Sequence, residues 1–76
     1  MIHLTILNPR ETLFDDDVNG VLVPGDLGDF EILSYHKPLI SLLRRGKFVL
    51  DGTRVIEVAR GIVRVHHDRI VALVEQ

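Results

Sequence analysis

At 76 residues the chain is long enough for one domain, residues 1–76, and no more. Its net charge of −2, without a stripe of Lys and Arg, argues against nucleic acid as a partner, and the absence of cysteine removes disulfides, zinc thiolates and thiol catalysis. The 46% share of hydrophobic residues exceeds what so small a core needs, so we expect a partner to cover part of the surface.

The chain opens with an alternating run. Ile2, Leu4 and Ile6 alternate with His3 and Thr5, which is the pattern of a strand with one face against a core. The same two polar residues interrupt the apolar run, so we expect no signal peptide. No stretch of about 18 apolar residues follows, so we expect no direct insertion into a membrane.

An acidic run comes next, at Asp15 to Asp17. It could suggest calcium, but it lacks the Gly and the distal Glu of an EF-hand loop. A solvated acidic edge strand, which discourages pairing between sheets of different molecules, fits the run better.

The segment from Pro24 to Gly28 contains two glycines. It has neither the Gly-Lys-Ser/Thr ending nor the following helix of a phosphate-binding loop, so its glycines are better explained as backbone turns. We therefore predict no nucleotide or other cofactor in this domain.

Only one segment has helical spacing, from Pro38 to Arg45. Leu39, Leu42 and Leu43 are about one turn apart, and Gly46 stands where a C-terminal cap would lie. The segment is short, and an extended conformation is equally compatible with its opening proline.

Two hairpins are expected later in the chain. Asp51-Gly52 favours a two-residue turn with positive φ, and His67-Asp68 separates two apolar runs. Short strands and frequent turn signals predict an all-β fold, a small β-sandwich or flattened barrel of about eight to ten short strands.

The polar clusters offer little for chemistry. Neighbouring strand residues point to opposite faces, so His66 and His67 are better explained as a solvated hairpin tip than as a metal site. His36 near Asp29 or Glu31 could act as a base with an orienting carboxylate, but no nucleophile motif accompanies it. Arg44-Arg45 is better explained as an exposed strand end than as an anion site.

Several short motifs follow one another between residues 24 and 39. They are Pro24-Gly25, Gly28-Asp29, Phe30, Ile32-Leu33 and His36-Lys37-Pro38-Leu39. Their order and spacing resemble the epsilon subunit of F-type ATP synthases, and the resemblance extends over nearly the whole chain. It implies the N-terminal β-sandwich of that subunit, an extended segment after Pro38, and a protein that is not an enzyme.

The resemblance also implies roles for individual residues. In the epsilon family this sandwich is part of the rotor, where it grips the gamma subunit and rests on the polar loops of the membrane-embedded c-ring. Gly28 and Asp29 fall where the family meets the c-ring. The gamma-facing side would hold Asn8, His36, Pro38, Leu39 and Ser41. The implied location is peripheral, on the cytoplasmic face of a bacterial inner membrane, and we expect a monomer in isolation.

The sequence departs from the family at two places. Glu31 stands where the family usually has glycine, and Ala59-Arg60-Gly61 replaces a common Gly-Gly pair by Arg-Gly. At both places the backbone conformation and the local contacts can therefore differ from those of the family. Most members also continue into two C-terminal helices that can bind nucleotide, and we expect no such binding from residues 1–76.

Three functions are considered for a chain with these features. The first is a non-catalytic central-stalk subunit that supports coupling of proton transport to ATP synthesis. The second is a small sandwich module that binds another protein through its apolar face. The third is an enzyme, for which the sequence offers no site.

Overall fold

The computed structural model describes residues 1–34 and 37–76. Within these ranges all regular structure is β-strand, which confirms the predicted all-β class, and no helix is present that could cross a membrane. The strands are β1 (Ile2–Leu7), β2 (Thr12–Val18), β3 (Gly20–Gly25), β4 (Gly28–Leu33), β5 (Leu39–Leu43), β6 (Gly46–Leu50), β7 (Arg54–Val58), β8 (Arg60–His66) and β9 (Arg69–Glu75). The segment with ambiguous helical spacing is therefore strand β5.

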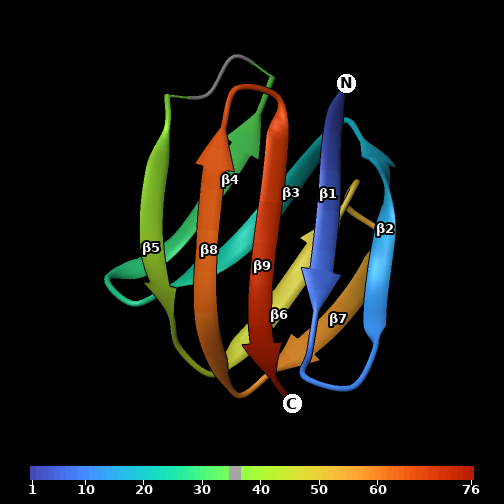
Figure 1. The fold of residues 1–76 in the computed structure, drawn as a ribbon. Coiled ribbons are helices and arrows are strands. Elements are labelled where there is room, and N and C mark those ends of the chain that lie inside the picture. The colour runs from blue at the N-terminus through green and yellow to red at the C-terminus, as the bar shows by residue number, and fades with distance from the viewer. Residues whose placement is uncertain (35–36) are drawn as a thin grey trace.

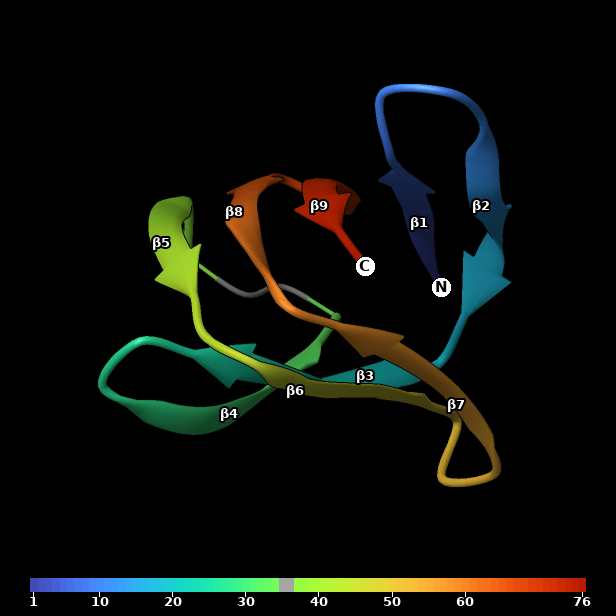
Figure 2. The ribbon, with the colours of Figure 1, turned by 90° about the horizontal axis from the view of Figure 1, so that it is seen from below.

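The strands form one curled sheet that folds into two layers. Its order is β2-β1-β9-β8-β5-β3-β6-β7, with β4 paired to β3. Figure 2 shows β5, β8, β9, β1 and β2 in one layer and β4, β3, β6 and β7 in the other. A single residue pair, Gly25 with Leu43, connects β3 to β5 at the corner. Figure 1 looks onto the first layer, which we call the front sheet; the second is the rear sheet.

Alternation places one face of each layer in the core. Side chains of β1, β8 and β9 from the front sheet meet those of β3 and β6 from the rear sheet, with Phe48 as the largest fully buried side chain. The far edges of the two layers also approach each other, since the Arg54 guanidinium carbon lies 5.1 Å from the centre of the Phe14 ring. The two layers are thus joined on one side by the β3–β5 corner and brought into contact on the other side by Arg54 and Phe14.

Both predicted hairpins are present. Asp51 and Gly52 have φ values of 51° and 74°, the positive sign that the predicted turn requires, and the Thr53 amide donates to the Leu50 carbonyl at 3.1 Å. Because Leu50 pairs with Arg54, the loop has three residues, Asp51 to Thr53, one more than the predicted two-residue turn. The β8–β9 turn holds His67, with φ of 56°, as expected for a hairpin tip.

Candidate functional site

One row of apolar residues crosses the outer face of the front sheet. Cross-strand pairing places Leu42 of β5 beside Ile62 of β8, Ile62 beside Leu73 of β9, and Leu73 beside Leu7 of β1. We call Leu7, Leu42, Ile62 and Leu73 the apolar belt. The alternate residues of the same strands are buried in the core, so the belt lies on the outside by strand geometry.

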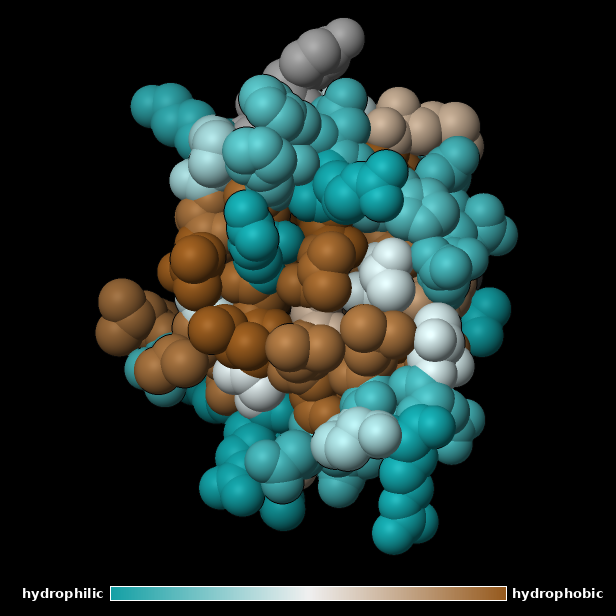
Figure 3. Space-filling model, viewed as in Figure 1, coloured by the Kyte–Doolittle hydropathy of each residue, from teal (hydrophilic) through white to brown (hydrophobic). Residues whose placement is uncertain are grey.

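The belt is open to solvent. Leu42, Ile62 and Leu73 are 62%, 39% and 53% exposed, and Ile40, two residues before Leu42 on the same face of β5, is 68% exposed. Figure 3 shows the resulting hydrophobic area across the middle of this face, bordered by hydrophilic side chains above and below. An exposed contiguous apolar area with a polar rim is typical of a protein interaction site.

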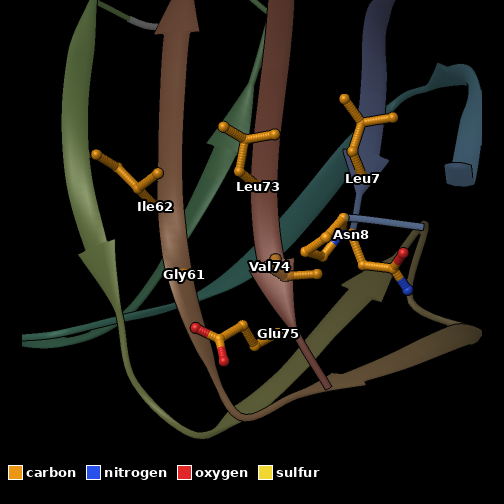
Figure 4. A pocket seen from close by; sticks show the side chains of 8 residues that line it. Leu7, Asn8, Gly61, Ile62, Leu73, Val74 and Glu75 are labelled. Carbon is orange, nitrogen blue, oxygen red and sulfur yellow. The ribbon is translucent and has the colours of Figure 1, made fainter. Parts of the chain in front are cut away.

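Two shallow hollows shape the belt. One of about 290 Å³ lies between Leu7, Ile62 and Leu73, with Asn8 at its margin (Figure 4). The other, of about 330 Å³, lies toward β5 and is lined by Ile40, Ile62, Arg64, Val71 and Leu73. Their apolar linings suit side chains projecting from a partner surface.

An exposed ion pair lies at the margin of the belt nearest the C-terminus. Arg60 Nε donates to Glu75 Oε2 at 2.9 Å, and Nη2 donates to Oε1 at 3.3 Å. Gly61, beside it, lies against β9 so closely that a Cβ there would be 2.3 Å from the Leu73 carbonyl oxygen. The Arg-Gly departure from the family pattern therefore has a local role, a two-point ion pair beside a close strand contact.

The opposite margin carries a polar cluster that the sequence alone did not reveal. His3 Nδ1 lies 2.9 Å from Asp17 Oδ1, His3 Nε2 lies 2.6 Å from Asp15 Oδ1, and Thr5 donates to the same Asp15 oxygen at 3.0 Å. Hydrogen bonds to Asp17 and Asp15 raise the pKa of His3 above its ordinary 6.5. Those from His3 and Thr5 lower the pKa of Asp15 below its ordinary 3.8.

The acidic run itself lies on β2, at one end of the strand order, so the predicted acidic edge is confirmed. At the tip of the β8–β9 hairpin, the His66 and His67 rings meet edge to face, with centroids 4.3 Å apart. Among residues 1–34 and 37–76 no group of three or more His, Asp or Glu side chains is arranged to hold a metal ion.

The residues implied for the gamma side differ in their surroundings. The Asn8 carboxamide oxygen accepts hydrogen bonds from the amides of Arg10 and Glu11 at 2.8 Å, so its polar end serves the turn after β1. Leu39 is partly buried against the core, Ser41 donates to the Leu42 carbonyl at 3.0 Å, and Pro38 is exposed. His36 lies outside the described residues.

The residues implied for the c-ring side lie elsewhere, on the β3–β4 hairpin of the rear sheet. Gly28 has φ of 135°, a conformation that favours glycine, and Asp29 is exposed. Arg44 Nη2 lies 3.7 Å from Asp29 Oδ1, a long and exposed ion pair. Leu27, at the tip of this hairpin, is fully exposed.

Sequence reasoning missed the belt, although a signal was present. Strand β5 reads Leu39-Ile40-Ser41-Leu42-Leu43, with apolar residues in both phases of the alternation, and β9 has Leu73 between the buried Ala72 and Val74. Apolar residues in both phases of a strand indicate that its outer face is apolar too, which is the pattern of strands covered on both faces.

The family model for the ATP synthase, Delta/Epsilon chain, beta-sandwich domain matches residues 1–76. This chain belongs to that family. The match over the full length agrees with the resemblance of the Pro24 to Leu39 motifs, and with the closed two-layer fold described above.

Curated relatives give the same family. The ATP synthase epsilon chain of Sulfurovum sp. is 35% identical over 79 residues, covering 99% of this chain and 62% of that protein. The epsilon chain of Caulobacter vibrioides is also 35% identical, covering 97% of this chain and 90% of that protein. Against most of these relatives, the chain spans about three fifths of their length.

Two solved structures share the fold. A chain in the central stalk and c-ring of the Tetrahymena thermophila mitochondrial ATP synthase superposes with a TM-score of 0.84 at 13% identity, covering 99% of this chain and 63% of that chain. A chain of the Euglena gracilis mitochondrial ATP synthase gives 0.85 at 16% identity, covering 99% and 51%. At these identities the likeness extends to the fold alone.

Proposed function

We propose that this chain is a non-catalytic subunit of the central stalk of an F-type ATP synthase, where it links the gamma subunit to the c-ring. Membership of the delta/epsilon family supports the assignment to an ATP synthase. The apolar belt on the front sheet is the surface for gamma, and the β3–β4 hairpin of the rear sheet, with Gly28 and Asp29, is the surface for the c-ring.

The belt is the observation that carries this assignment. A stable protein interface takes on the order of 800 Å² from each partner, about a sixth of the 5012 Å² surface of this chain. The belt with Ile40 and its two hollows supplies the apolar centre that such an interface needs. Leaving these side chains in water would forgo stabilisation of about 25 cal/mol for each Å² of apolar surface.

The separation of the two surfaces fits a linking role. The belt faces outward from one layer of the sandwich, whereas Asp29 lies on the other layer, beyond the corner formed by Gly25 and Leu43. A packed sandwich is stiff, so a torque applied at one face is transmitted to the other. In this assignment the chain is peripheral at the cytoplasmic face of a bacterial inner membrane, held there by its partners.

The assignment is tested by co-purification and by coupling. The tagged chain, expressed with the gamma subunit and c-ring of its own organism, should retain both through a wash at moderate salt. Membranes depleted of this chain should hydrolyse ATP with reduced proton pumping, and adding the purified chain should restore pumping. Failure to retain gamma, or restored pumping without any bound chain, would contradict the proposal.

A further inference from the structure

A cation, Arg64, lies beside the apolar belt on the front sheet. Arg64 of β8 pairs with Ile40 on one side and with Val71 on the other. Along its own strand the next outward residue is Ile62 of the belt. Arg64 also lines the 330 Å³ hollow together with these apolar side chains. Its guanidinium therefore stands at the edge of the surface that a partner of the belt would cover.

Arg64 has no partner within the part of the chain that the structure describes. Two other arginines do: Arg60 pairs with Glu75 at 2.9 Å, and Arg44 with Asp29 at 3.7 Å. The carboxylate in the same cross-strand row as Arg64 is Asp15, three strands away or about 14 Å at the usual strand spacing.

A second cation reinforces the local charge. Arg69 of β9 lies one pair further along, opposite His66, and both line a hollow of about 180 Å³ together with Arg64. Asp15, the carboxylate whose charge interacts with Arg69, already receives hydrogen bonds from His3 and Thr5. Arg64 and Arg69 thus bring two positive charges to one hollow beside the belt, although the chain carries a net charge of −2.

Covering the belt would also remove water from Arg64. Burying an unpaired guanidinium is strongly unfavourable, and the free energy is recovered only if an opposite charge and its hydrogen bonds come with the partner. A planar guanidinium matches a carboxylate through two parallel hydrogen bonds, which an ammonium group cannot do.

We propose that the gamma subunit places a carboxylate side chain, surrounded by apolar residues, against Arg64, and that this pair sets the register of the gamma contact. The proposal rests on the assignment of the belt to gamma. It adds the chemistry of the partner surface: an acidic group over Arg64 and apolar groups over Ile62 and Leu73. Arginine is among the residues that most often dominate the binding energy of a protein interface.

The test is the affinity of the chain for gamma, measured by calorimetry. Arg64→Met keeps the length and apolar stem of the side chain but leaves the carboxylate of gamma unpaired, so affinity should fall by about thirtyfold or more. Arg64→Lys should fall by less, because the charge remains. Lys47→Met, which removes an exposed cation from β6 of the rear sheet, is the matched control and should bind as the unmodified chain does.

The partner group is then found by a double-mutant cycle. Each surface Asp and Glu of gamma is changed to Asn or Gln, alone and with Arg64→Met, and one of them should show effects that are not additive. Affinity that is unchanged or increased in Arg64→Met, while Leu73→Asp still weakens binding, would overturn this proposal and leave the belt assignment standing. Loss of the Leu73→Asp effect would overturn both.

Discussion

The imidazole of His3 joins the first strand to Asp17 of the edge strand, with 2.9 Å between Nδ1 and Oδ1. Its other nitrogen lies 2.6 Å from Asp15 Oδ1. Only a protonated imidazole can donate from both nitrogens, so the cross-strand link is complete only when His3 is charged. This ties the pairing of β1 and β2 to pH.

Stability should therefore depend on pH in a definite window. The pKa of His3 is raised on folding, so its contribution is complete below the ordinary value of 6.5 and is lost as pH rises through the folded-state value. The pKa of Asp15 is lowered, so its contribution is present above 3.8 and is lost as pH falls through the folded-state value. Between these limits the cluster stabilises most.

Urea unfolding at pH 5.5 and pH 8.5 measures this dependence. From pH 5.5 to pH 8.5, the free energy of unfolding should fall more for the unmodified chain than for His3→Gln. An NMR titration should place the pKa of His3 above 6.5. His66→Gln, which removes another exposed histidine, should keep the full pH difference. A His3 pKa at or below 6.5 would show that the two hydrogen bonds do not persist in solution.

The turn residue Asp51 should matter for stability beyond its hairpin. Its Oδ1 accepts from the amides of Asn19 and Gly20 at 2.8 and 3.0 Å, and its φ is positive. Asp51→Ala should cost about 1–3 kcal/mol, because it leaves two backbone donors without their acceptor and strains the backbone. Asp51→Asn keeps an acceptor oxygen and tolerates positive φ, so in urea unfolding it should lose clearly less. Equal losses in the two variants would contradict this role.

Gly61 should not tolerate a side chain. A Cβ at this position would stand 2.3 Å from the Leu73 carbonyl oxygen, a backbone atom that cannot move without shifting β9. We expect Gly61→Ala to destabilise the fold by about 1–3 kcal/mol in urea unfolding. Because Ile62 and Leu73 flank this contact, binding to gamma should weaken as well. An unchanged unfolding midpoint would mean that the strands can separate here without cost.

The class of fold was predictable from sequence because alternation and turn residues are local. Ile2, Leu4 and Ile6 are buried as their spacing indicated, and both hairpins lie at the predicted dipeptides. The segment from Leu39 to Leu43 is a strand although its spacing also fits a helix, because it pairs along its whole length with β8, a distant partner that local spacing does not reveal.

The surfaces were less predictable, because they depend on pairing between distant strands. Leu42, Ile62 and Leu73 become neighbours only through the register of β5, β8 and β9, which no local pattern specifies. The link from His3 to Asp15 likewise depends on the pairing of β1 with β2. Leu39, implied for the gamma side, is partly buried, so its substitution would test folding as well as binding.

The c-ring assignment predicts an effect on coupling. Asp29 is exposed, and exposed ion pairs contribute only about 0–1 kcal/mol, so Asp29→Ala should loosen the ring contact slightly and leave gamma binding intact. Asp29→Lys places a positive charge against basic groups of the ring loops. In membranes it should uncouple ATP hydrolysis from proton pumping. Glu57→Lys, a charge reversal on β7 of the same layer, is the control. Full coupling and ring attachment with Asp29→Lys would rule out this contact.

The affinity for gamma of two matched variants tests the central claim most directly. Leu73 of the belt and Leu33 of β4 are the same residue type and both 53% exposed, but they lie on opposite layers. Circular dichroism should confirm that Leu73→Asp and Leu33→Asp both fold. We predict that Leu73→Asp weakens binding to gamma by about thirtyfold or more, while Leu33→Asp changes it by less than about threefold. Equal affinities for the two variants would contradict the assignment of the apolar belt to gamma.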